Sequence, residues 1–399
     1  MRPLRTLAHV PVVAGLLAGC ASIDNQPVNR PLAGNLPDAM IVGTEGTSYS
    51  DDLMIGLAFS GGGTRAAAFS YGVLAEIDRV QVPGRGGTTS LLDRVDFVSG
   101  VSGGSVLAAY FGLKKRAALD DFRERFLLRD AEESLSTGVS PFSITRALAG
   151  GVNDSTQFPR WLDTNLFEGA TFREFRSDRR PRVWINASDI YNRTSFVFGA
   201  TAFGALCSDL SSYPIADAVA ASAAVPVLFA PVVIQSFPRE CNARLPEWIQ
   251  RARNNPNAPP MLKSFADAIA RYHDGSMPYV KLLDGGLVDN FGLSGFTIAR
   301  MSSETPYGPF TPQQAVKLRR SIFVVVDAGR APSGDWVQTV EGPRGVDLVM
   351  AAADTATEAA LRASFTAFES TMADWQQQLV RWRCGLSAAQ RQRFGVALS

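Results

Sequence analysis

Short apolar runs alternate with amphipathic stretches along most of the chain. The apolar runs at 53–60 and 95–100 each end at a glycine-rich turn, and a stretch with helical periodicity follows each turn. Strand, turn and helix repeated in this way predict a largely parallel sheet covered by helices. The predicted strands are 53–60, 95–100, 182–188, 195–200, 225–234, 279–286 and 321–329. We therefore expect an α/β fold, with a mostly parallel central sheet covered by helices on both faces.

Two segments depart from this alternation. Residues 237–278 form an irregular insertion, in which the polar stretch ARNNPNAPP separates two amphipathic helix candidates. Such an insertion is either a lid or a surface excursion, and the surface excursion is the favoured interpretation. After residue 330 the strand signal ends, and residues 331–399 are expected to form a C-terminal helical extension. Its apolar stripe, at steps of four and three, is Leu361, Phe365, Phe368, Met372, Trp375, Leu379 and Trp382. The stripe fits a coiled-coil seam, but packing across the chain's own domain is favoured because barely three heptads are available.

The N-terminal residues have the pattern of an export signal. Two arginines precede an apolar run at 7–17 that is too short to span a bilayer. The segment LAGC that ends at Cys20 resembles the lipobox of bacterial lipoproteins, in which cleavage precedes a cysteine that is then acylated. Residues 1–19 would be a signal peptide, Cys20 a lipid anchor, and residues 20–50 a tether rich in proline and glycine. An ordinary cleavage site with a chance cysteine is the alternative.

The residue after Cys20, the net charge and the number of cysteines indicate where the protein is located and which partners it can bind. The residue after Cys20 is Ala21, as in lipoproteins sorted to the outer membrane, so we expect a bacterial cell envelope protein at the outer membrane, facing the periplasm. A formal net charge of +1 gives no general attraction for nucleic acid. The cysteines after Cys20 are odd in number for an oxidising compartment, and pairing of Cys207 with Cys241 stays open. The sequence does not indicate an oligomeric state.

A serine lies in the setting of a catalytic nucleophile. GVSGG, residues 100–104, fits G-x-S-x-G between a predicted strand and a predicted helix, with Ser102 at its centre. The alternative is a small residue in a tight bend. Of the two histidines, His9 lies in the export signal and His273 at the edge of the insertion. A dyad in which a carboxylate acts directly as base is therefore favoured over a Ser-His-Asp triad.

A glycine-rich loop upstream could bind an anion. Gly61, Gly62 and Gly63 follow an apolar strand and open a helix, where backbone N–H groups can converge on one oxyanion. Arg65, at the start of that helix, can brace the loop or contact an anionic head group. A phosphate-binding loop is the competing interpretation, but the G-x-x-x-x-G-K-[ST] lysine and the G-x-G-x-x-G spacing are missing.

Together these segments resemble the patatin-like phospholipases. SGGGTR matches the glycine-rich oxyanion loop of that family, GVSGG its nucleophile elbow, and LLDGGLVDN its D-G-[GA] motif, while ASAAVPVLFAPV resembles its proline-bearing segment. The resemblance implies a catalytic domain over residues 51–330. It implies that Ser102 is the nucleophile, Asp284 its base, and Gly61 to Gly63 the oxyanion donors. Asp274 and Asp327 compete with Asp284 for the role of base.

The resemblance implies a serine acyl-ester hydrolase acting on membrane lipids, of the phospholipase or lysophospholipase type. This chemistry requires no metal and no organic cofactor. Acyl transfer to another alcohol, or a non-catalytic scaffold lipoprotein of the envelope, are the alternatives. A basic cluster could contact anionic lipid, although a solvated face is the favoured interpretation. Its arginines are at 173, 176, 179, 180 and 182.

Overall fold

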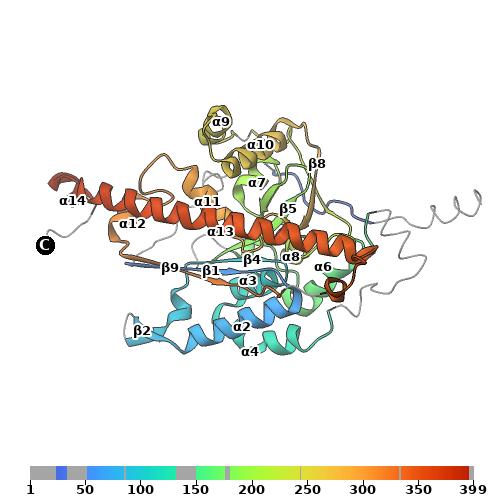
Figure 1. The fold of residues 1–399 in the computed structure, drawn as a ribbon. Coiled ribbons are helices and arrows are strands. Elements are labelled where there is room, and N and C mark those ends of the chain that lie inside the picture. Colours follow the sequence, from blue (N-terminus) through green and yellow to red (C-terminus); the bar gives the residue numbers. More distant parts are fainter. Residues whose placement is uncertain are drawn as a thin grey trace, which may run out of the picture.

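The computed structural model describes most of the chain, and its described residues are 24–33, 52–84, 87–131, 150–175, 180–242, 244–331 and 334–394. Their largest feature is a mixed sheet between two layers of helices (Figure 1). The expected α/β architecture is confirmed, including the helical extension at the C-terminal end. Cys20 and the export signal lie outside the described residues, so the structure does not address them.

The central strands of the sheet are parallel, and one edge is antiparallel. The parallel strands, in spatial order, are β5 (Arg182–Asp189), β4 (Phe97–Val101), β1 (Leu53–Phe59) and β9 (Arg320–Val326). Antiparallel pairing adds β8 (Tyr279–Asp284) and β6 (Thr194–Val197) to β5, and β7 (Val232–Gln235) to β8. A separate hairpin consists of β2 (Gln81–Gly84) and β3 (Gly87–Ser90). Because the four parallel strands share a direction, their carboxyl ends lie along one edge of the sheet.

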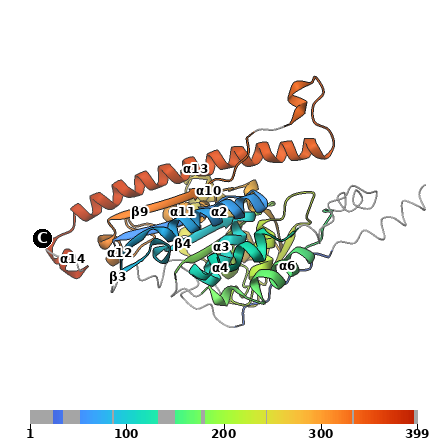
Figure 2. The same cartoon turned by 90° about the horizontal axis from the view of Figure 1, so that it is seen from below.

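Both faces of the sheet are buried, each in its own core. Along β1, Ile55 and Leu57 belong to one core, while Met54 and Ala58 belong to the other. This alternation is what a strand covered on both faces requires. The first core is covered by α2 (Gly63–Arg79), α3 (Gly103–Lys114), α4 (Ala118–Phe122) and α8 (Ile215–Ser222). The second is covered by α11 (Ser294–Met301) and α13 (Val346–Cys384), and Figure 2 shows the sheet between α13 and α3. Shorter helices include α6 (Gln157–Leu162), α7 (Ala200–Ala205), α12 (Pro312–Lys317) and α14 (Ala388–Arg393).

The long helix α13 packs across its own domain, as favoured from the sequence. Its 39 residues begin at Val346, and Phe368, Trp375 and Leu379 are buried in the second core. The rest of the predicted stripe packs against the same core. The stripe therefore closes one face of the sheet and needs no second helix to cover it.

The segment 237–278 is not a surface excursion, and that prediction is wrong. It forms α9 (Glu247–Asn254) and α10 (Pro260–Asp274). The apolar face of α10 carries Phe265, Ile269 and Tyr272 into the first core. The sequence suggested an insertion because α10 lies between two polar turns, but the apolar face of this amphipathic helix completes the first core.

The strand predicted over 225–234 begins only at Val232. The residues before it form turns, and Val227 has a φ of 73°. Pro226 and Pro231 restrict the backbone and remove two N–H donors, so this part of the apolar run cannot continue a sheet ladder. The segment 224–231 instead passes beside the end of β8, where Ala224 O accepts a hydrogen bond from Asp284 N at 2.9 Å.

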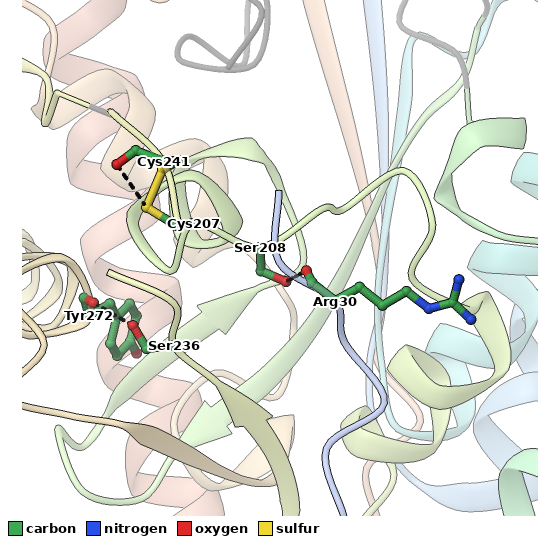
Figure 3. Close-up of a disulfide and its surroundings, with 6 residues drawn as sticks. All are labelled: Arg30, Cys207, Ser208, Ser236, Cys241 and Tyr272. Carbon is green, nitrogen blue, oxygen red and sulfur yellow. Dashed lines mark hydrogen bonds between the residues drawn. A yellow bond between two sulfur atoms is a disulfide. The ribbon is translucent and has the colours of Figure 1, made fainter. Parts of the chain in front are cut away.

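Residues 24–33 are held against the domain, so the prediction of a tether over 20–50 is wrong for this part. Asn29 Nδ2 donates to Gln235 O at 2.8 Å, and Asn29 Oδ1 accepts from Gln235 N at 2.9 Å. The Asn29 amide thereby satisfies the edge of β7 as a neighbouring strand would. Ser208 Oγ donates to Arg30 O at 3.1 Å (Figure 3). Residues 34–51 lie outside the described part of the chain.

Cys207 and Cys241 form a disulfide bond across a sequence separation of 34 residues, with their Cα atoms 5.5 Å apart (Figure 3). This resolves the pairing that the sequence left open. Cys384, at the end of α13, is free and exposed. Among the helices of the described residues, none is both long and apolar enough to cross a bilayer.

Candidate active site

Ser102 lies at a strained turn between β4 and α3. Its φ of 50° and ψ of −125° are in a region that side chains other than glycine rarely occupy. The glycines around it allow a close approach of backbones, since a Cβ on Gly104 would lie 2.5 Å from the carbonyl oxygens of Phe59 and Ser60. Ser102 is the residue that caps the N-terminus of α3, so the positive end of the helix dipole is directed at it.

The side chain of Ser102 faces the carboxylate of Asp284, close enough to lower the pKa of that group. Both residues are buried. Asp284 Oδ1 accepts the N–H of Gly286 at 2.8 Å. Burial raises the pKa of Asp284 from 3.8 to about 6, and the Gly286 N–H and the Ser102 hydroxyl limit that rise. At neutral pH the carboxylate is thus ionised, yet it is a stronger base than an exposed aspartate.

The register of the sheet explains why residues so far apart in sequence meet. Val101, just before Ser102, is paired with Asn186 on β5. The next residue on β5, Ala187, is paired with Asp284 on β8. Ser102 and Asp284 therefore leave their strands at the same level, on either side of β5. The predicted meeting of these two side chains is what the structure contains.

The glycine loop lies across the Ser102 turn. A Cβ on Gly61 would lie 3.4 Å from that of Ser102, and a Cβ on Gly103 would lie 1.9 Å from Gly63 O. Gly62 and Gly63 have φ values of 137° and 62°, which favour glycine. These conformations carry the chain from β1 directly into α2, beside the serine.

One of the three predicted oxyanion donors is already engaged. Gly61 N donates to Asn290 O at 3.1 Å, so this N–H is not directed at a ligand, and its assignment as a donor is wrong in this conformation. Within the described residues, the N–H groups of Gly62 and Gly63 have no hydrogen-bond partner. They lie at the N-terminus of α2, where four N–H groups lack partners within the helix. Two donors of the predicted three thus remain.

Arg65 braces the loop from outside. Its Nε donates to Ala328 O at 2.9 Å, and Ser60 Oγ accepts from Ala328 N at the same distance. These bonds tie both ends of the glycine loop to the segment after β9. Burial lowers the pKa of Arg65, nearby Arg330 lowers it further, and Asp327 opposes this. Of the two roles predicted for Arg65, bracing is the one with contacts in the structure.

Three supporting residues were not identified from the sequence. Ser222 Oγ accepts the N–H of Ser102 at 2.9 Å and donates to Asn186 O at 2.6 Å. The Asn186 amide in turn donates to Gly100 O at 2.9 Å, just before the serine turn. Asn290 Oδ1 lies so close to Gly61 and Gly286 that a Cβ on either would clash with it. The signals available were a polar residue within a mostly apolar segment, for Asn186 and Ser222, and the position of Asn290 at the end of the LLDGGLVDN motif.

The competing acid and base candidates have other roles. Asp274 Oδ1 accepts from Ser276 N, and Asp327 Oδ1 accepts from Gly329 N, both at 2.8 Å, so each carboxylate stabilises a turn. His273 lies in the last turn of α10, and its Nδ1 has no partner among the described residues. In the basic cluster, Arg180 pairs with buried Asp96 at 3.0 Å, which is a structural contact.

Comparison with known proteins gives a family for this arrangement. The family model described as "Patatin-like phospholipase" matches residues 57–297. Among solved structures, that of VipD from Legionella pneumophila is similar to this chain, with 15% sequence identity and a TM-score of 0.22. The match covers 54% of this chain and 49% of VipD, so it spans about half of that protein's length. A search of curated proteins found no match.

Proposed function

The chain belongs to the patatin-like phospholipase family and is a lipid acyl hydrolase, and from this premise we propose that it works through a Ser102–Asp284 dyad. The observation that carries the proposal is that these two buried side chains lie together at the strained turn that opens α3. A carboxylate whose pKa is raised to about 6 is poised to accept a proton from a hydroxyl near neutral pH.

The proposed reaction begins with attack by Ser102 Oγ on the ester carbonyl carbon, while Asp284 takes the hydroxyl proton. The N–H groups of Gly62 and Gly63, together with the dipole of α2, stabilise the oxyanion of the tetrahedral intermediate. Asp284 then returns the proton to the leaving alcohol, and an acyl-enzyme on Ser102 remains. Water, activated by the same carboxylate, attacks that ester and releases the fatty acid, which restores both residues.

We further propose that the substrate is a phospholipid or lysophospholipid and that the protein reaches it as an envelope lipoprotein. The likeness of LAGC to a lipobox supports acylation at Cys20. Ala21 supports sorting to the outer membrane, with the domain on the periplasmic side.

The chemistry is tested with a soluble chromogenic short-chain ester. Ser102→Ala and Asp284→Asn should each lower kcat/KM at least about a thousandfold. Asp274→Asn, a matched removal of one carboxylate that accepts a backbone N–H in a turn, and His273→Ala should retain most activity. For the wild type, kcat/KM should fall below a pH of about 6 as Asp284 becomes protonated. Activity that survives Asp284→Asn but not His273→Ala would replace the dyad with a histidine-dependent mechanism.

A further inference from the structure

A small apolar tip projects from the body of the protein just before α13. It consists of residues 334–341, which include the 3-10 turn η8 (Asp335–Gln338). Trp336 is 44% exposed, Val337 70% exposed, and Val340 fully exposed. Leu348 and Val349, at the start of α13, are also exposed. Figure 2 shows this turn standing away from the rest of the molecule. Large apolar side chains gathered on a projection indicate a contact surface.

The tip has a defined shape. Val337 N donates to Gly334 O, and Thr339 N donates to Trp336 O, both at 3.3 Å. Thr339 Oγ1 donates to Glu341 O at 3.0 Å. Gly334 has a φ of 140°, and a Cβ there would lie 2.3 Å from the indole nitrogen of Trp336, so the indole packs on bare backbone. The backbone that carries the exposed side chains is therefore held in place before any ligand arrives.

The tip belongs to the same end of the molecule as Ser102. β9 runs parallel to β1 and β4, so residues 327–331 leave the sheet at the edge where Ser102 also lies. Ala328, in this connection, contacts Arg65 and Ser60 of the glycine loop. In both overall views the turn before α13 lies toward the end of the molecule opposite α14 (Figures 1 and 2).

The N-terminal segment begins near this end too. Ser155 N donates to Asp24 O at 3.2 Å, and Asn25 Nδ2 donates to Pro231 O at 3.3 Å. Pro231 ends the segment that starts at Ala224, the partner of Asp284. Only residues 21–23 separate Asp24 from Cys20, and four residue steps span at most about 14 Å. An acyl chain on Cys20 would therefore bring a bilayer close to the edge that carries Asp284.

We propose that the tip inserts into the interfacial region of a lipid bilayer and, together with acylated Cys20, holds the active-site end against the leaflet that contains the substrate. The inference rests on the proposed function. A bilayer is the occupant because Trp336, Val337 and Val340 cover far less than the roughly 800 Å² that each partner of a stable protein interface buries. Tryptophan, apolar with one polar N–H, suits the membrane interface.

The first test compares two triple variants of the full chain. The tip variant is Trp336→Ser, Val337→Ser and Val340→Ser. Its control is Phe69→Ser, Val80→Ser and Val380→Ser, which likewise removes one aromatic residue and two valines, each about half exposed. Substrates are vesicles of phosphatidylethanolamine and phosphatidylglycerol, and a soluble short-chain ester. The tip variant should hydrolyse vesicle lipid about tenfold more slowly and the soluble ester at the wild-type rate. The control variant should match the wild type on both.

The second test reads position without activity. A fluorescent probe is attached at Val340→Cys in a Cys384→Ser background, and separately at native Cys384. In vesicles with brominated lipid, the Val340 probe should be quenched and the Cys384 probe should not. Quenching without Ser102-dependent hydrolysis would refute the proposed chemistry and leave the membrane contact standing. Equal vesicle activity of wild type and tip variant, no quenching at 340, or a dimer that the tip variant dissociates would overturn the membrane contact.

Discussion

Replacing Asp284 with asparagine should abolish hydrolysis and, at the same time, stabilise the fold above pH 6. Burial raises the pKa of this carboxyl from 3.8 to about 6. Between these two values the native state holds a proton that the unfolded chain has lost. The free energy of unfolding therefore falls as pH rises through this window, and the full penalty is present above it. Asparagine cannot ionise, so the variant escapes the penalty.

The size of the effect follows from the two pKa values. A difference of about two units corresponds to about 3 kcal/mol at pH 8, at 1.36 kcal/mol for each unit. At pH 4 the unfolded aspartate is only about half ionised, and the penalty falls to roughly 0.5 kcal/mol. The variant keeps an oxygen that can accept the N–H of Gly286, so the loss of that bond should not mask the gain.

Urea unfolding of wild type and Asp284→Asn at pH 4, 6 and 8, with the disulfide intact, measures this difference. Ser102→Ala serves as the control, because it removes activity without removing the buried charge. The stabilisation by Asp284→Asn should be about 2.5 kcal/mol greater at pH 8 than at pH 4. A stabilisation independent of pH, or a destabilisation at pH 8, would refute the argument that burial sets the basicity of this carboxylate.

Three other outcomes are expected. Ser222→Ala leaves the buried N–H of Ser102 without a partner, so it should destabilise the fold by about 1–3 kcal/mol in urea unfolding. The same variant should lower kcat more than it raises KM, and an unchanged kcat would contradict a role of Ser222 in positioning Ser102. The double variant Cys207→Ser, Cys241→Ser should lose about 4 kcal/mol of stability and melt at a lower temperature, and an unchanged Tm would show that this loop is ordered without its disulfide. Trp375→Ala removes a buried ring from the second core and should cost about 3–5 kcal/mol, whereas a cost below 1 kcal/mol would mean that α13 is not needed to cover the sheet.

Much of the sheet, and the candidate pair Ser102 and Asp284, could be predicted from local patterns and motifs. β1 and β4 are short, mostly apolar runs that lead into glycine-rich turns, so the ends of both strands could be predicted, and with them the position of Ser102 at one of these turns. Asp284 was identified through the resemblance of LLDGGLVDN to the D-G-[GA] motif, and the strand before it and its two glycines favoured it over other aspartates. The position of Asp284 beside Ser102 depends on how β5 is aligned with β4 and β8, and the sequence pattern does not predict this register.

What escaped prediction depends on contacts between distant segments. α10 was taken for an excursion because its buried face is visible only when the core that receives it is known. Asn29 carries no strand pattern, yet its side chain completes the edge of β7. The engagement of Gly61 by Asn290 O could not be foreseen either, since it joins a loop after β1 to a loop after β8.

The hydrogen bond between Ser60 and Ala328 joins two segments that are synthesised at very different times. β1 is synthesised early, but it can pair with β9 on one side only after most of the chain has been synthesised. Long delays of this kind make the closing of a sheet a late event in folding. A growing polypeptide would contain Ser102 long before it contains β9 and the segment after it, which supports the glycine loop. Hydrolytic competence should thus be acquired only when the molecule is nearly complete, and fragments that stop short of β9 should be inert.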